Sequence, residues 1–495
     1  MNKLKINIIS SIFLQTVTII SGFIIPKIIL LNFGSNVNGL ISSINQFLNY
    51  VTLLEGGIGS VIMAILYKPL RDSNAKRVSQ IVNTTLYFFK KLSYVYITYV
   101  IFFSIVYPLF VNTGFNFWYS VLLIWVLALN LFFQYFLSIS YRLLLNADRK
   151  IFYVSFVQAL ALILNFISVL IFINFIKNII VIKTITALVF LIQPIAYYIY
   201  TKKHYLIRRE DGTDKETLNH RWDGFGINLA FFIHSNTDIA ILTAFASLAD
   251  VSVYTVYLLI VKALKSMVSS ISSAILPSFG NVLASGNKKE SNVAFNRYEF
   301  GIGVITTFIF TCGMILITPF VDVYTIGVLD ANYHKQLFGI LIVFSEMVYC
   351  YRDPYVSTAY AAGHIKQLTK FAYVEALLNI VISLFLVKKL GLIGIAVGTI
   401  IAMIYRTAMQ VYYLKNNILY RPIRLFAKNL NVNIICMVLP MIICYRLLNL
   451  NVNSYFEWFI LAIKVGLIVL VFTIFIYVIF LKDDLLAFFN KEGRE

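Results

Sequence analysis

Long apolar runs alternate with short polar breaks along the whole chain. A helix needs roughly 20 mainly apolar residues to cross a bilayer core of about 30 Å, and about fourteen runs reach that length. The predicted spans are residues 7–31, 39–67, 85–111, 118–145, 152–174, 179–200, 224–245, 253–277, 299–326, 336–361, 370–387, 391–413, 430–448 and 457–481. The pattern therefore predicts an all-α membrane protein with about 14 transmembrane helices.

Composition supports this class. The 495 residues are 60% hydrophobic and only 13% charged, with a mean hydropathy of +0.83, which no soluble globular class resembles. A formal charge of +19 would suggest a nucleic-acid partner in a soluble protein, but here the basic residues lie in loops between spans. We therefore expect membrane lipids and no nucleic acid as partners. The four cysteines lie singly, without the spacing of a metal site, and no cofactor is predicted.

The distribution of Lys and Arg predicts the orientation. With the N-terminus inside, about 29 of the 41 basic residues fall in cytoplasmic segments, and such a bias fixes topology. Both termini are therefore expected in the cytoplasm, and basic loops such as 68–77 and 201–222 are expected to attract anionic lipid. No loop is long enough for a soluble catalytic domain, which argues against an enzyme.

The chain also resembles itself. "NADRKIFYVSFVQALALILNFI" (146–167) is similar to "AAGHIKQLTKFAYVEALLNIVI" (361–382), and 66–77 parallels 276–289. Six intervening spans preserve orientation, so the halves are predicted to be parallel six-helix repeats, a geometry suited to alternating access; duplication without transport is the other interpretation. The predicted parts are an N-terminal lobe (1–200), a cytoplasmic linker (201–223), a C-terminal lobe (224–414), a cytoplasmic loop (415–429), helices 13 and 14 (430–481) and a cytoplasmic tail (482–495).

The second predicted span carries a polar stripe. Its members recur every three or four residues and so share one face of a continuous helix, with Glu55 beside them. They are Asn38, Ser42, Asn45, Asn49, Thr52, Gly56 and Gly59. We expect this face to be wetted, with Asn45 and Asn49 contacting substrate.

The eighth span repeats the pattern with two lysines. Lys262 and Lys265 follow Tyr254 and Leu258 and precede Ser269 and Ser272 on the same face. A central Lys costs about 2.5 to 3.5 kcal/mol on insertion scales, so it is tolerable when it faces water or a counter-charge. Snorkelling is the alternative, but two mid-helix lysines one turn apart reach an interface poorly. We predict that both line a cavity.

Two arginines are further candidates for substrate binding. Arg352 and Asp353 lie in "YCYRDPYVSTAY" (349–360), where Pro354 withdraws a backbone donor, and Arg406 lies late in its span. A contact between Arg352 and Asp353, or a pairing across helices, would make these residues purely structural. For Arg406 an interfacial role is an equal alternative.

Four acidic residues within spans are candidates for coupling to an H⁺ or Na⁺ gradient: Glu55, Asp238, Glu346 and Asp353. A buried carboxylate can take up a proton or coordinate a cation. Equally, each can neutralise a lysine or arginine. Glu346 and Asp353, seven residues apart, are predicted to share a helix face.

A wet cationic cavity suits an anionic substrate. A lipid-linked phosphate or pyrophosphate fits best, because its headgroup needs the basic interior while its tail stays in the bilayer. Lysine would act as a point charge for the phosphate and arginine as a planar fork.

Two segments resemble a known family. "IIPKIILLNFGSNVNGLISSINQFLNYVTLLEGGIGSVI" (24–62) resembles the opening of Wzx-type polysaccharide repeat-unit flippases, and "NTDIAILTAFASLADVSVYTVYLLIVKAL" (236–264) resembles the start of their second lobe. These belong to the multidrug, oligosaccharidyl-lipid and polysaccharide exporter superfamily. In that family, basic residues in the lumen engage pyrophosphate and sugar acids, and Lys262 and Lys265 occupy a comparable place.

The resemblance implies a flippase in the bacterial cytoplasmic membrane. Its substrate would be undecaprenyl-pyrophosphate-linked oligosaccharide, moved to the outer leaflet for capsule, exopolysaccharide or O-antigen synthesis. Polysaccharide polymerase and glycosyltransferases would be partners. The alternatives are a lipid II flippase or an ion-coupled drug exporter of the same superfamily. A membrane polysaccharide polymerase is less consistent with the sequence, because the long outer loop with clustered Arg or His expected of it is missing.

Overall fold

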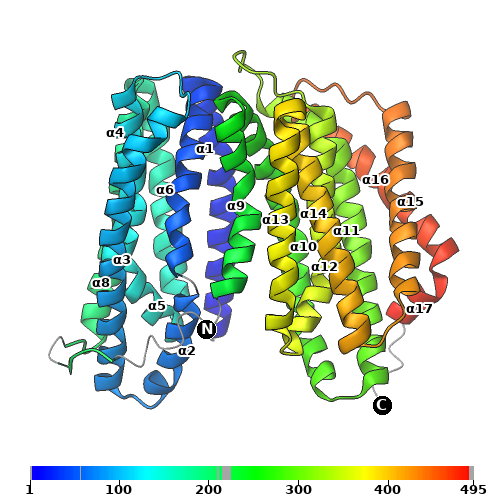
Figure 1. The fold of residues 1–495 in the computed structure, drawn as a ribbon, viewed down its shortest axis with the longest axis horizontal. Coiled ribbons are helices and arrows are strands. Elements are labelled where there is room, and N and C mark those ends of the chain that lie inside the picture. Colours follow the sequence, from blue (N-terminus) through cyan, green and yellow to red (C-terminus); the bar gives the residue numbers. More distant parts are fainter. Residues whose placement is uncertain (1–2, 56, 209–210, 215–224, 490–495) are drawn as a thin grey trace. The chain divides into compact units, whose positions relative to one another are not determined.

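The computed structural model describes residues 3–55, 57–208, 211–214 and 225–489. All regular structure in these residues is helical (Figure 1). Eleven helices in this part are long and apolar enough to cross a membrane. The predicted class, an all-α membrane protein, is confirmed. Three predicted spans, 39–67, 224–245 and 336–361, are not separate members of these eleven. Span 39–67 is partly merged into one helical stretch, Lys5–Glu55. Span 336–361 carries three charged residues, Glu346, Arg352 and Asp353, which lower its apolar character.

The chain divides into two compact units: unit 1 is Met1–Phe232 with Ser247–Ser252, and unit 2 is Ile233–Ala246 with Val253–Glu495. Helix α9 (Phe225–Phe245) begins in the first and ends in the second. The other helices of unit 1 are α1 (Lys3–Leu48), α2 (Ile58–Arg71), α3 (Ala75–Phe110), α4 (Phe117–Phe133), α5 (Ile139–Ala147), α6 (Ile151–Phe175), α7 (Ile179–Phe190) and α8 (Ile192–His204). Packing of α1 on α6, of α3 on α4 and of α6 on α7 forms much of its interior.

The second predicted span is not one helix. Gly34 interrupts α1 with φ 81°, and α1 ends at Leu48, where the 3-10 turn Asn49–Glu55 begins. Gly57, with φ 87°, then starts α2; glycine reaches positive φ without a steric penalty. The prediction of one continuous polar face from Asn38 to Gly59 is therefore wrong, because a 3-10 turn rotates side chains by a different angle from an α-helix.

The fourth predicted span is also irregular. A π-helical turn, Gln134–Ser138, separates α4 from α5. It carries Tyr135, whose ring stacks at 6.1 Å on Phe89 and meets Tyr96 edge-on at the same centroid distance. Such turns concentrate at functional sites, and this one places an aromatic side chain in the core of unit 1.

The remaining helices lie in unit 2, except that the first five residues of α10, up to Ser252, belong to unit 1. They are α10 (Leu248–Ala284), α11 (Lys288–Tyr324), α12 (Gln336–Ala361), α13 (Ile365–Leu390), α14 (Leu392–Asn417), α15 (Ile423–Leu447), α16 (Tyr455–Phe480) and α17 (Lys482–Phe489). Helices α15 and α16 pack on each other and on α11, and α17 also packs on α11 and α16 (Figure 1). Unlike its counterpart in unit 1, the eighth span lies within one unbroken helix, α10.

Helices α13 and α14 approach closely at two glycines. A Cβ at Gly394 would lie 2.6 Å from the carbonyl oxygen of Leu386, and one at Gly398 would lie 2.4 Å from Oγ of Ser383. Small residues four apart allow helix backbones to pack tightly inside membranes. This pair fixes the position of α14, which carries Thr399 and Arg406.

We expect Gly394→Ala to destabilise the protein by about 1–3 kcal/mol, because the added methyl group would overlap backbone rather than a movable side chain. Gly466→Ala on α16 is the matched control, since no heavy atom lies within 4 Å of its Cβ position. Thermal unfolding of the purified full chain in detergent measures the difference. Equal midpoints for the two variants would contradict the close-packing account.

Candidate functional site

Charged side chains from four helices of unit 2 form a series of contacts. Nζ of Lys265 on α10 lies 2.9 Å from Oε2 of Glu346 on α12. The same ammonium group sits 3.4 Å from the ring centroid of Tyr349. The guanidinium of Arg352 lies 4.8 Å from the centroid of that ring. Tyr349 therefore lies within cation–π distance of two cations.

The register of α10 against α12 follows a seven-residue spacing. Lys265 contacts Glu346, and seven residues further along both helices Ser272 donates a hydrogen bond to Asp353. Ser272 also bonds to the hydroxyl of Tyr298. Seven residues return a helix to nearly the same face, so the prediction that Glu346 and Asp353 share a face is confirmed.

Two arginines share one buried carboxylate. Nη1 of Arg352 donates to Oε1 of Glu375 at 2.8 Å, and Nη1 of Arg406 donates to Oε2 of the same group. The side chains of Glu375 and Arg352 are 0% and 2% exposed. Of the alternatives for Arg352, pairing across helices is the one observed, and its partner is Glu375 on α13 rather than Asp353.

The sequence analysis did not single out Glu375. A signal existed in the internal repeat, where "YVEAL" of the second half matches "FVQAL" of the first. Glu375 therefore replaces the amide of Gln158 with a carboxylate. A charge at only one of two equivalent positions indicates a partner that only one half possesses, and Arg352 and Arg406 are that partner.

The charges of the candidate residues in unit 2 balance. The cations are Lys262, Lys265, Arg352 and Arg406, and the carboxylates are Asp238, Glu346, Asp353 and Glu375, four of each. In the described part of the chain, no carboxylate lies within ion-pairing distance of Lys262, which is exposed on unit 2. These eight residues therefore carry no excess of positive charge, and Lys262 is the one of the four cations that takes part in no ion pair among the described residues.

Asp238 lies in a separate polar cluster of the same unit. Its Oδ2 accepts hydrogen bonds from the hydroxyls of Tyr254 at 2.8 Å and Thr399 at 3.2 Å. Thr399 in turn accepts from Nδ2 of Asn379 at 2.9 Å. Among the described residues, Oδ1 of Asp238 and Oδ1 of Asn379 are buried and accept no hydrogen bond. Hard oxygen donors of this kind suit a proton or a small hard cation.

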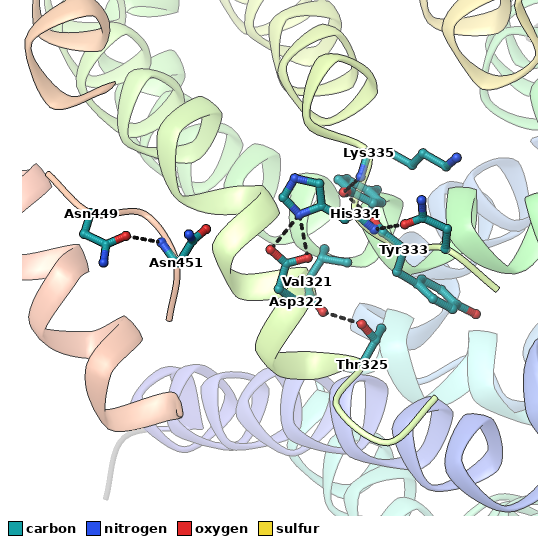
Figure 2. A network of polar contacts seen from close by, with 10 residues as sticks. Val321, Asp322, Thr325, Tyr333, His334, Lys335, Asn449 and Asn451 are labelled. Carbon is teal, nitrogen blue, oxygen red and sulfur yellow. Dashed lines mark hydrogen bonds and ion pairs between the residues drawn. The ribbon is translucent and has the colours of Figure 1, made fainter. Parts of the chain in front are cut away.

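Polar contacts join Tyr257 of α10 to the loop before α12. The backbone N–H of Lys335 donates to the hydroxyl of Tyr257 at 3.1 Å. In the same loop Nδ1 of His334 lies 2.9 Å from Oδ2 of Asp322 (Figure 2). Tyr257 precedes Lys262 on α10 by about a turn and a half, so this network positions the lysine along the helix axis.

The predicted residues of unit 1 do not share one helix. Asn45 lies within α1, whereas Asn49 is the first residue of the 3-10 turn and Glu55 is its last. Asn45 and Asn49 are both exposed on unit 1. Glu55 is partly buried and interacts electrostatically with Tyr135 and Arg142, two neighbours that the sequence analysis did not single out.

This architecture defines a helical membrane transporter. The fold matches a solved structure of the lipid II flippase MurJ in an inward closed conformation, with a TM-score of 0.71 and 17% identity over 96% of this chain and 99% of that one. It also matches an inward-facing multidrug resistance MATE family transporter of the MOP superfamily, with a TM-score of 0.64 and 15% identity over 81% and 96%. A third match is the MATE multidrug transporter DinF-BH, at 0.60 and 13% over 85% and 96%.

The amino-acid sequence assigns this chain to a family. The sequence model of the family described as lipid II flippase MurJ matches residues 42–466. The chain belongs to this family and is therefore a multi-pass membrane transporter of the lipid flippase class, not an enzyme. No curated protein sequence matches it.

The family match corrects one expectation. The resemblance of 24–62 and 236–264 to Wzx-type flippases predicted the flippase class, but the family whose model matches is described as lipid II flippase MurJ. The flippase class is confirmed.

We expect Glu375→Gln to destabilise the protein by about 3–5 kcal/mol, because it leaves two guanidinium groups without their carboxylate in a buried site. Glu290→Gln, at the exposed start of α11, is the matched control. Thermal unfolding of the purified full chain gives the comparison. A Glu375 variant as stable as the control would show that the shared carboxylate does not hold α12, α13 and α14 together.

Proposed function

We propose that this protein translocates lipid II across the cytoplasmic membrane of a bacterium, with both of its termini in the cytoplasm. Membership of the MurJ family over residues 42–466 carries the proposal. Lipid II has the chemistry that the sequence suggested for the substrate, an anionic pyrophosphate headgroup on a long apolar tail. The headgroup needs a polar route, and the tail needs an apolar one.

Unit 2 contains one candidate surface for the headgroup of lipid II and another for its tail. Lys262 is exposed, and the partly buried Lys265 follows one turn later; an ammonium group binds phosphate as a point charge. A separate groove between α11, α12 and α15 has a volume of about 450 Å³, and its lining includes Met314, Phe344 and Met441. Flexible methionine side chains adapt to irregular apolar ligands, so we assign this groove to a prenyl tail.

A second candidate substrate is an undecaprenyl-pyrophosphate-linked oligosaccharide repeat unit. The observation that favours it is the likeness of 24–62 and 236–264 to Wzx-type flippases. Under this candidate, polysaccharide polymerase and glycosyltransferases would be the partners. The two candidates share the pyrophosphate and the tail and differ in the sugar.

We expect Lys262→Gln with Lys265→Gln to lower lipid II translocation at least about tenfold, because each charge-assisted contact to phosphate contributes about 1.5–3 kcal/mol. Glutamine preserves a hydrogen bond to Glu346 while removing the charge. Proteoliposomes containing the full chain and fluorescent lipid II measure the rate. Lys289→Gln, exposed on α11, is the control.

The same assay separates the candidates. Translocation of lipid II but not of a lipid-linked repeat unit supports the proposal, and the reverse result establishes the second candidate instead. A lysine double variant with the normal rate and the normal amount of protein in the membrane would remove these residues from the substrate path.

We further propose that Asp238 couples transport to a Na⁺ or H⁺ gradient, because unpartnered oxygens of Asp238 and Asn379 lie in one buried cluster. Glu55, Glu346 and Asp353 remain weaker candidates. Glu346 already neutralises Lys265, and Asp353 accepts from Ser272.

Asp238→Asn is expected to abolish the dependence of translocation on the imposed gradient, since it removes the charge that binds the ion. Rates are compared with and without a Na⁺ gradient, and with and without a pH gradient, in otherwise identical vesicles. Asp483→Asn on α17, an exposed residue, is the control. If the Asp238 variant keeps the gradient dependence of the unmodified chain, the coupling ion binds elsewhere.

A further inference from the structure

A groove in unit 1 lies apart from the residues discussed so far. It is formed by α3, the π-helical turn with α5, α8 and residues 212–213 of the predicted linker, and its volume is about 690 Å³. Its lining includes Tyr87, Phe136, Ile195 and Tyr198. This volume lies within the roughly 300–1,000 Å³ of a typical ligand pocket.

The linker forms a fixed wall of this groove. The hydroxyl of Ser79 donates to the carbonyl of Arg208 at 3.0 Å and accepts from its N–H at 2.8 Å. Further along α3, the N–H of Asp214 donates to the hydroxyl of Thr84 at 2.8 Å, and Arg77 pairs with the Asp214 carboxylate at 2.8 Å. Contacts at both ends of the segment hold it against α3, so the groove is a defined shape rather than a gap beside a loose loop.

Two cations lie over aromatic rings of the lining. Nζ of Lys90 is 5.5 Å from the ring centroid of Phe136, and Nζ of Lys202 is 6.0 Å from that of Tyr198. The described lining contains no carboxylate. Lysine and tyrosine side chains of this kind place their polar tips at a membrane interface and their apolar parts in the bilayer.

The position of Lys90 agrees with such an interface. It lies about one and a half turns inside the predicted span 85–111. Helix α8 ends with Lys202, Lys203 and His204, immediately before the linker. The groove thus has an apolar part deeper in the span and basic groups toward the linker.

We propose that this groove binds one anionic phospholipid. Its phosphate lies between Lys90 and Lys202, and an acyl chain lies along Phe136, Ile195 and Tyr198. Charge complementarity selects the occupant, because two ammonium groups lie over the rings of a lining that contains no described acid, while the aromatic part requires an apolar chain. None of the groove's lining residues is among those proposed to contact the substrate.

Native mass spectrometry of the purified full chain tests this site. With added phosphatidylglycerol we expect one retained lipid, and with phosphatidylcholine we expect markedly less. Lys90→Gln with Lys202→Gln is expected to weaken phosphatidylglycerol binding about 25-fold, from the usual contribution of a basic residue near anionic lipid. Lys370→Gln is the matched control, since Lys370 also lies over a phenylalanine ring, at 5.1 Å, but in unit 2.

A second variant tests the apolar part of the groove without changing a charge. Ile195→Trp fills the apolar part of the groove and is expected to abolish lipid retention while preserving the unfolding temperature, because Ile195 is 52% exposed. Equal binding of the two phospholipids, or full retention in either variant, would overturn the proposal. Displacement of phosphatidylglycerol by an equal concentration of a polyprenyl phosphate would also overturn it, because the groove would then serve a prenyl lipid.

Discussion

A charge inside an apolar helical bundle must be paired, and this constraint governs the structure of unit 2. The carboxylate of Glu375 is completely buried and holds Arg352 and Arg406 from two other helices. Breaking a buried pair is far more destabilising than its net contribution suggests, because the remaining charge has no water to solvate it. One carboxylate therefore fixes the register of α12, α13 and α14, and the glycines Gly394 and Gly398 allow the close approach it requires.

The same constraint distinguishes cations that have a carboxylate partner from a cation that has none. Lys265, Arg352 and Arg406 each have a carboxylate partner, whereas in the described residues Lys262 has none within ion-pairing distance. Lys262 is also the exposed member of this group, which is why the proposed function assigns it to the headgroup. Asp238 accepts hydrogen bonds from the hydroxyls of Tyr254 and Thr399 and forms no ion pair among the described residues.

Irregular turns interrupt the helices of unit 1, whereas buried ion pairs join the helices of unit 2. Its second span is divided by a 3-10 turn and Gly57, and its fourth by a π-helical turn. The corresponding α10 of unit 2 is continuous. The two halves resemble each other in sequence but differ in their local helical geometry.

By itself, the sequence determined the all-α membrane class, most helix positions and the shared face of Glu346 and Asp353, because bilayer thickness and helical periodicity act locally along the chain. It also indicated the flippase class through motif order. Only the tertiary structure decided that Arg352 pairs with Glu375 and that the stripe from Asn38 to Gly59 is broken. It also decided that residues of the linker form one side of a groove on α3. These depend on which helices become neighbours, and that follows from packing between residues distant in the chain.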